Sequence, residues 1–271
     1  MKGRVWTGGL VAVAVGTLAA CSSGGGDATT PTSPPPVKLT VLAAASLAKV
    51  FPRIGDAFTR ANPGVAFTFE FAGTDALAAQ IQQGAPADVF AGASTKYGDQ
   101  LSAAGLVDTP RPFATNRLVL ILPASDPAGI TSLKDLTEPG IKLVIGAETV
   151  PVGAYTRTVL TNLDAVYGAS YSADVLANVV SNEDSVTSVV SKVQLGEADA
   201  GFVYVTDALA AGSAVKTIDL PAEAQAVATY PIAVVKASKD ATDAQLFADF
   251  VLSAPAQAML RQAGFGPPPT A

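Results

Sequence analysis

Apolar and polar positions along the chain follow two alternating patterns. Short runs of β-branched and aliphatic residues, typical of buried strands, precede stretches in which apolar residues recur every three or four positions, as in helices. The predicted strands cover residues 37–42, 64–71, 87–91, 117–122, 141–145, 200–205 and 229–235. The predicted helices cover residues 46–58 (with Ser46 as its cap), 74–82, 95–104, 132–136, 152–163, 183–195, 206–211, 243–252 and 255–262.

This alternation of strands and helices predicts an α/β fold, with mostly parallel sheets covered by helices. We expect two lobes, because helix N-termini from both halves of the chain are needed around one site. Lobe 1 is predicted to comprise residues 37–116 plus 230–271, and lobe 2 residues 117–229. The chain would cross between the lobes near residue 116 and return near residue 229, so that two crossing strands form a hinge.

The first 20 residues have the pattern of a secretion signal. Lys2 and Arg4 precede an apolar stretch that is shorter than a membrane span. The stretch ends in Leu-Ala-Ala-Cys21, which resembles a bacterial lipobox, in which the signal is cut before the cysteine and the cysteine is lipidated. The alternative is a plain signal peptide with an incidental cysteine. Residues 21–36 would then be the lipidated Cys21 and a flexible tether rich in Gly, Ser, Thr and Pro. These features predict an extracytoplasmic protein anchored to the cell membrane.

Composition excludes several kinds of chemistry. The chain has no histidine and a single cysteine, so neither a Ser-His-Asp triad nor a histidine- or thiolate-ligated metal site can form. The formal net charge is −6, and removal of the two positive charges of the signal would make it −8. This acidic balance argues against nucleic acid as a partner. It also means that a bound anion would be held by local geometry and not by the field of the whole protein.

Four predicted helix starts share small or hydroxyl residues and contain no basic side chain. A helix N-terminus offers unpaired backbone N–H groups and the positive end of the helix dipole, which together suit an anion. The alternative for each is an ordinary cap that binds only its own backbone. The four starts are Ala45-Ser46, Gly73-Thr74-Asp75, Pro151-Val152-Gly153 and Asp184-Ser185-Val186. Tyr204 ends a predicted strand, where its hydroxyl would be either one more neutral donor or part of the core.

Six motifs distributed in order over nearly all of residues 38–266 resemble the periplasmic molybdate-binding proteins of ABC transporters. They are residues 41–47 (VLAAASL), 71–74 (FAGT), 84–89 (GAPADV), 150–155 (VPVGAY), 196–204 (GEADAGFVY) and 230–234 (YPIAV). The resemblance implies a type II periplasmic-binding fold with two lobes. It implies a molybdate or tungstate ligand that is passed to a membrane permease, with no enzymatic activity and no cofactor. We expect a monomer whose lobes close around the ligand.

The resemblance also implies a set of ligand-binding residues. Ser46 would give its hydroxyl and backbone N–H, and Thr74 stands where the family usually has a second serine. Val152 stands where alanine is usual, and only its backbone N–H is needed. Val186 would give a backbone N–H, and Tyr204 its hydroxyl. These groups would hold the oxygen atoms of the oxyanion, with no protein ligand to the metal itself.

Two alternatives stay open at this stage. Asp75 departs from the small neutral residue usual in the family, and we expect its carboxylate to point away from the oxyanion because like charges repel. Asp75 and Val152 are the best support for the same fold binding another oxyanion, such as sulfate or phosphate. The other alternative is a hydrolase with Ser46 as nucleophile and Lys49 as base, although residues 44–47 lack the glycines of a nucleophile elbow.

Overall fold

The computed structural model describes residues 36–269. The predicted signal peptide (1–20), Cys21 and the tether up to residue 35 lie outside the described residues. Within the described part of the chain, no helix combines the length and apolar character that a membrane crossing requires.

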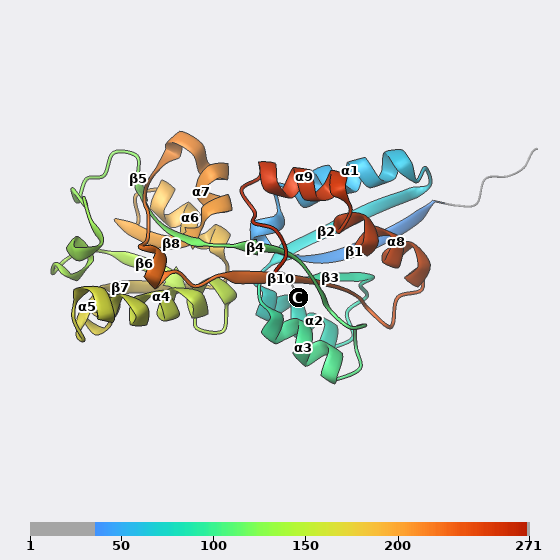
Figure 1. Cartoon of the computed structure of the whole chain (residues 1–271), viewed down its shortest axis with the longest axis horizontal. Coiled ribbons are helices and arrows are strands. Elements are labelled where there is room, and N and C mark those ends of the chain that lie inside the picture. The colour runs from blue at the N-terminus through green and yellow to red at the C-terminus, as the bar shows by residue number, and fades with distance from the viewer. Residues whose placement is uncertain (1–35, 270–271) are drawn as a thin grey trace, which may run out of the picture. The chain divides into compact units, whose positions relative to one another are not determined.

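The first lobe, called lobe 1 here, is built on a sheet of five strands (Figure 1). In spatial order they are β2 (Val65–Ala72), β1 (Val37–Ala44), β3 (Val89–Ala91), β10 (Ala228–Val234) and β4 (Arg111–Asn116). β1 runs parallel to β2 and β3, whereas β10 is antiparallel to both of its neighbours. Figure 1 shows α1 (Phe51–Ala61), α8 (Ala241–Val251) and α9 (Ala254–Gln262) on one face of this sheet, with α2 (Thr74–Gln82) and α3 (Thr95–Ala103) on the other.

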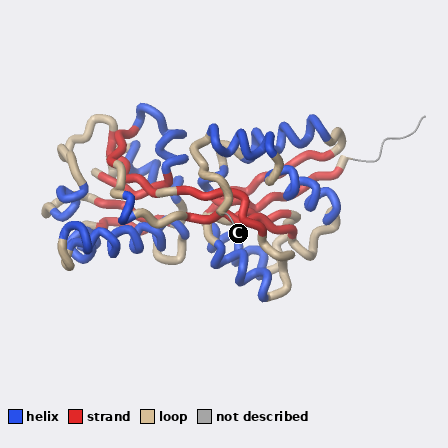
Figure 2. The backbone as a smooth tube through the Cα atoms, viewed as in Figure 1, coloured by secondary structure: helices blue, strands red, loops and turns tan. Residues whose placement is uncertain are grey.

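The second lobe, lobe 2, has the same plan. Its strand order is β7 (Val179–Glu183), β6 (Leu143–Gly146), β8 (Ala200–Tyr204), β5 (Leu118–Pro123) and β9 (Val215–Ile218), with β5 antiparallel to both neighbours. Its helices are α4 (Pro151–Tyr167), α5 (Tyr171–Ala177), α6 (Val186–Gln194) and α7 (Val205–Ala211). Short 3-10 turns cover Leu133–Thr137, Gly212–Ala214 and Ala222–Ala224. Figure 2 shows the strands at the centre of each lobe and the helices around them.

Two segments join the lobes. β4 ends at Asn116 and β5 begins at Leu118, so a single residue separates a strand of one sheet from a strand of the other. The return segment leads into β10, and Gln225 ties it to β5 through hydrogen bonds with both the N–H and the carbonyl of Leu118 (3.3 and 3.0 Å). Tyr230 on β10 is fully buried and packs edge to face on Phe113 of β4, with ring centroids 6.1 Å apart. Buried aromatic pairs of this kind fix the position of the strands that carry them.

The α/β class predicted from the sequence is confirmed, and so are most of its elements. The predicted cap at Ser46 is wrong: residues Ala45–Leu47 form a 3-10 turn (η1), and α1 begins only at Phe51, with Val50 as its N-cap. Pro52 lies in the first turn of α1, where its missing N–H costs no hydrogen bond. The sequence-based interpretation also missed four short elements, namely β4, α5, β7 and β9. Three of them are edge strands of mixed polarity, which carry a weak apolar pattern.

Candidate binding site

All five residues singled out from the sequence line one small pocket between the lobes. Ser46 and Thr74 come from lobe 1, and Val152, Val186 and Tyr204 come from lobe 2. The pocket has a volume of only about 10 Å³. This is about the space that one water molecule needs, so no drug-sized organic ligand fits between the lobes in this arrangement.

The walls of the pocket are helix starts. η1, α2, α4 and α6 each begin at it, and the first residues of a helix have no intrahelical acceptor for their N–H groups. Three of these four starts have no side-chain cap, since their capping residues are Ala44, Gly73 and Val150. In the fourth, the Ser185 hydroxyl accepts from the N–H of Ser188 (3.3 Å), which leaves the N–H of Val186 free of the cap. Ser185 is therefore the N-cap of α6.

The two lobes meet closely at Gly73. A Cβ atom at this position would lie 2.4 Å from the carbonyl oxygen of Asp184 in lobe 2, a separation that no side chain tolerates. Glycine therefore allows the start of α2 to approach the start of α6. This contact brings the N-termini of helices from different lobes to the same pocket.

The hydroxyl of Ser46 is held by the hinge. Ser46 is 7 % exposed, and its Oγ lies 2.9 Å from the phenolic oxygen of Tyr230 on the return strand β10. The Tyr230 hydroxyl also lies 3.4 Å from Nδ2 of Asn116, which donates to Oγ1 of Thr206 (2.9 Å). Burial raises the pKa of Tyr230 well above its ordinary value, so this phenol stays neutral. Sequence reasoning found Tyr230 only as part of a motif and missed its contact with Ser46.

The hydroxyl of Thr74 is oriented by lobe 1. Its Oγ1 accepts a hydrogen bond from the backbone N–H of Ala93 (3.1 Å), which leaves the hydroxyl hydrogen free to donate. The additional methyl group of Thr74 faces Gly92, where a Cβ would lie 2.9 Å from Cγ2 of Thr74. In the same way, Cγ1 of Val152 faces Gly146, where a Cβ would lie 2.7 Å away. Thr74 and Val152, which are larger than the serine and alanine usual in the family, therefore each place a methyl group against a glycine.

The hydroxyl of Tyr204 has no hydrogen-bond partner within residues 36–269, although the residue is only 1 % exposed. A buried polar group without a partner costs about 1–3 kcal/mol, so such a group points to a partner that the protein itself does not supply. Burial, together with the neighbouring Tyr230, Tyr155 and Asp207, raises its pKa well above the ordinary value. Tyr204 therefore offers the pocket a neutral O–H donor.

Asp207 lies behind Tyr204 and was not identified from the sequence. Its Oδ2 accepts the backbone N–H of Tyr204 (3.3 Å) in the first turn of α7. Burial raises the pKa of this carboxyl to about 7, against the lowering effect of hydrogen bonds from the backbone N–H groups of Tyr204 and Asp207. Near neutral pH it is therefore divided between its neutral and charged forms. No local motif marks the position, because its burial depends on packing of distant segments.

Asp75 does not line the pocket. Its Oδ2 instead accepts a hydrogen bond from Oγ1 of Thr149 in lobe 2 (3.0 Å), and the hydroxyl of Tyr97 in lobe 1 donates to the carbonyl of the same Thr149. Both contacts join lobe 1 to the loop that precedes α4. The absence of the carboxylate from the pocket is consistent with the expectation that it points away from a bound anion, which stays a prediction.

The pocket thus presents neutral donors from both lobes around one small space. Within residues 36–269, no group of three His, Cys, Asp or Glu side chains is arranged to hold a metal ion. A serine nucleophile requires a hydrogen bond to a base, whereas Ser46 Oγ forms its hydrogen bond with the neutral hydroxyl of Tyr230. Two lobes joined by two crossings, with convergent donors between them, define a solute-binding protein.

Residues 39–266 match the family described as bacterial extracellular solute-binding protein, and the chain belongs to that family. It is 40 % identical to the molybdate-binding protein ModA of Mycobacterium tuberculosis over 264 residues, which is 97 % of each chain. It is 32 % identical to the ModA of Haemophilus influenzae, covering 84 % of this chain and 89 % of that protein. The solved periplasmic molybdate-binding protein of Azotobacter vinelandii shares the fold, with a TM-score of 0.73, 22 % identity and coverage of 85 % of this chain and all of the other. These relatives are named as binding proteins, and this chain is a solute-binding protein and not an enzyme, contrary to the hydrolase alternative.

Proposed function

We propose that this protein captures molybdate, and tungstate of nearly the same size, outside the cytoplasm and delivers it to an ABC permease. The buried hydroxyl of Tyr204, which lacks a partner where four helix starts converge, carries this proposal. The names of the relatives at 40 % and 32 % identity support molybdate as the ligand. A tetrahedral dianion has four acceptor oxygens and no donor, and so matches a pocket of donors.

The proposed contacts are shared between the lobes. Ser46 and Thr74 would donate through hydroxyl groups and helix-start N–H groups, and Tyr204 through its phenol. Val152 and Val186 would donate through backbone N–H alone. Because no cationic side chain lines the pocket, release requires no ion pair to be separated. The donors lie on both lobes, so capture would close them around the ion and delivery would open them.

We further propose the arrangement of the whole chain. Residues 1–20 would be a lipoprotein signal peptide, and lipidated Cys21 with residues 22–36 would tether the domain to the cell membrane. Residues 37–116 and 230–271 would move as lobe 1, and residues 117–229 as lobe 2. We propose a monomer, since each chain holds every donor of its own pocket.

Selection of molybdate over sulfate or phosphate would depend on size. A rigid set of donors fits one ionic radius well, and a smaller ion leaves donors unpaired at a cost. Asp75 and Val152, which on sequence grounds supported another oxyanion, support it less strongly once their positions are considered. Asp75 does not line the pocket, and Cγ1 of Val152 packs against Gly146.

The test is a thermal-shift panel on the purified protein with molybdate, tungstate, sulfate and phosphate. A ligand that binds only the folded state raises apparent stability by about 2.7 kcal/mol at a concentration 100 times its Kd. We expect a clear rise in Tm with molybdate and tungstate, and none with sulfate or phosphate at equal concentration. Ser46→Ala combined with Thr74→Val should abolish the rise, whereas Ser102→Ala on α3, away from the pocket, should keep it. An equal rise with sulfate would favour the alternative oxyanion, and no rise with any ion would refute oxyanion binding.

A further inference from the structure

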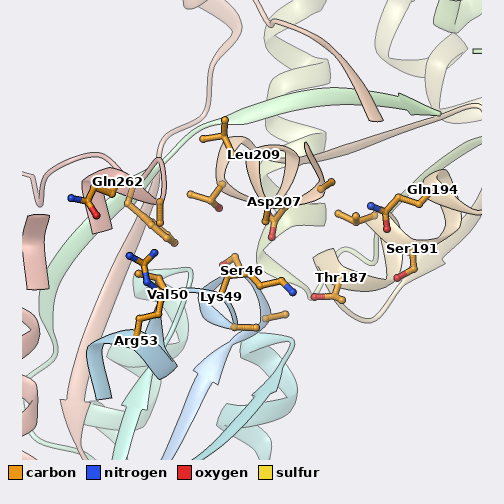
Figure 3. A pocket seen from close by; sticks show the side chains of 18 residues that line it. Ser46, Lys49, Val50, Arg53, Thr187, Ser191, Gln194, Asp207, Leu209 and Gln262 are labelled. Atoms are coloured by element: carbon orange, nitrogen blue, oxygen red, sulfur yellow. The ribbon is translucent and has the colours of Figure 1, made fainter. Parts of the chain in front are cut away.

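A second and much larger cavity adjoins the binding pocket. Its volume is about 450 Å³, and it shares Ala45 and Ser46 with the pocket (Figure 3). η1, the start of α1 and the end of α9 form its lobe 1 wall, and α6 and α7 form its lobe 2 wall. The turn η1, which carries Ser46, therefore lines both the cavity and the pocket.

The lobe 1 wall of this cavity is positively charged. Lys49, in the turn before α1, and Arg53, in the first turn of α1, both line it, and both are exposed to solvent. In the described part of the chain neither side chain takes part in an ion pair, since the pairs found there involve Arg111, Lys192 and Lys236. Figure 3 shows both cations on the side of Ser46, across from Asp207 and Thr187.

The opposite wall does little to cancel this charge. Thr187, Ser191 and Gln194 on α6 are neutral, and Asp207 is the one acidic residue that lines the cavity. Burial raises the pKa of Asp207 to about 7, so it is partly protonated near neutral pH. The cavity therefore has a net positive lining beside a pocket that has no cation of its own.

The positive charge of this cavity opposes the electrostatic repulsion between the acidic protein and an anion. The formal net charge of the chain is −6, so its overall field repels a dianion. A local patch of the opposite sign in a concave surface raises the local concentration of an ion and its association rate by a factor of about 10 to 1,000. Exposed cations act in this way without fixing the ion tightly, because solvent and salt weaken each contact.

We propose that this cavity is the encounter site of the oxyanion, where Lys49 and Arg53 attract the ion before it passes Ser46 into the pocket and the lobes close. The proposal rests on the oxyanion-binding function proposed above. In it, Lys49 and Arg53 raise the association rate of the ion. Held outside the pocket, they raise the rate of entry more than the stability of the final complex.

The experiment compares the wild-type protein with the double variant Lys49→Gln/Arg53→Gln. The matched control is Lys38→Gln/Arg60→Gln, which removes two exposed positive charges from lobe 1 at positions that do not line the cavity. Stopped-flow tyrosine fluorescence gives kon for molybdate at NaCl concentrations from about 10 to about 300 mM, a range over which the Debye length falls from about 30 Å to below 10 Å. Calorimetry gives Kd for each protein.

We expect the wild type and the control to show a kon that falls steeply as salt rises. In the cavity variant, kon at low salt should be about five- to tenfold lower and nearly independent of salt, while Kd rises by a smaller factor. Equal kon and equal salt dependence in all three proteins would overturn the encounter site, and so would an equal loss in the control. If the wild type shows no molybdate binding by calorimetry, the oxyanion function itself fails, a result distinct from bound molybdate with unchanged kon.

Discussion

The hydroxyl groups of Ser46 and Tyr230 lie 2.9 Å apart, in a buried hydrogen bond that joins the turn after β1 to the strand that returns from lobe 2. The two residues are 184 positions apart in the sequence. Through Asn116 the same network reaches Thr206 in lobe 2. The orientation of a proposed ligand hydroxyl thus depends on the segments where the chain crosses between lobes.

Tyr230→Phe should weaken molybdate binding by about five- to thirtyfold, because loss of one hydrogen-bonded partner costs about 1–2 kcal/mol. The substitution leaves the ring and its packing on Phe113 in place but frees the Ser46 hydroxyl to rotate. Calorimetric titration measures the effect. Tyr167→Phe, in α4 and away from the pocket, is the control and should leave Kd unchanged. An unaltered Kd in Tyr230→Phe would show that Ser46 needs no orienting partner.

Tyr204→Phe should have opposite effects on stability and on affinity. Without ligand, the variant should be as stable as the wild type or more stable by about 1 kcal/mol, because a buried hydroxyl without a partner is removed. Molybdate affinity should fall by at least tenfold, because the proposed donor is lost. Chemical denaturation measures the first quantity and calorimetry the second. A loss of stability with unchanged affinity would mean that the phenol has a structural role only.

Asp207 should make stability depend on pH in the acid range. Its native pKa of about 7 is higher than the value of 3.8 for an unperturbed carboxyl, so between these values the native state holds more protons than the unfolded state. The contribution of Asp207 to the free energy of unfolding is therefore fully present below about pH 4 and is lost as the pH rises through 7. The loss amounts to about 2–4 kcal/mol. Asp207→Asn should remove this part of the pH dependence and be more stable than the wild type at pH 8. Urea denaturation at several pH values tests this, and parallel curves for the two proteins would contradict it.

Thr149→Val should speed release of the ligand. The substitution removes the 3.0 Å hydrogen bond to Asp75 across the lobes but keeps the backbone carbonyl that accepts from Tyr97. The contact is solvent-exposed, so we expect koff to rise by only about two- to fivefold, with little change in kon. Stopped-flow dissociation measures koff. Thr158→Val, on the exposed face of α4, is the matched control, and equal koff in both variants would exclude a role of Thr149 in keeping the lobes closed.

Elements with a strong local pattern could be predicted from the sequence. The predicted bounds of the helix Thr74–Gln82 match the structure, and Gly84 follows it with a positive φ of 83°. The starts of α2, α4 and α6 were recognisable from the residues at them, Gly73-Thr74, Pro151 and Ser185. The cap assigned to Ser46 failed because the chain makes a separate 3-10 turn first, and Pro52 was the better local signal for the start of α1.

Contacts between distant segments could not be predicted in this way. The role of Tyr230 depends on a partner in another element, and the raised pKa of Asp207 depends on burial by segments from the rest of the fold. Likewise, the sequence has an acid at residue 75, but no local pattern indicates that the hydroxyl of Thr149 donates a hydrogen bond to it. Each of these features is a property of the assembled lobes.

The glycines behind Thr74 and Val152 restrict how this pocket can be redesigned. Trimming Thr74 to serine would not enlarge the space for the ion, because the lost methyl group lies against Gly92, which does not line the pocket. Trimming Val152 to alanine would remove Cγ1, which lies against Gly146 in the same way. Such a change would leave a void behind the lining. Anyone who wishes to alter the size of the accepted ion should therefore vary each lining residue together with its glycine, as a pair.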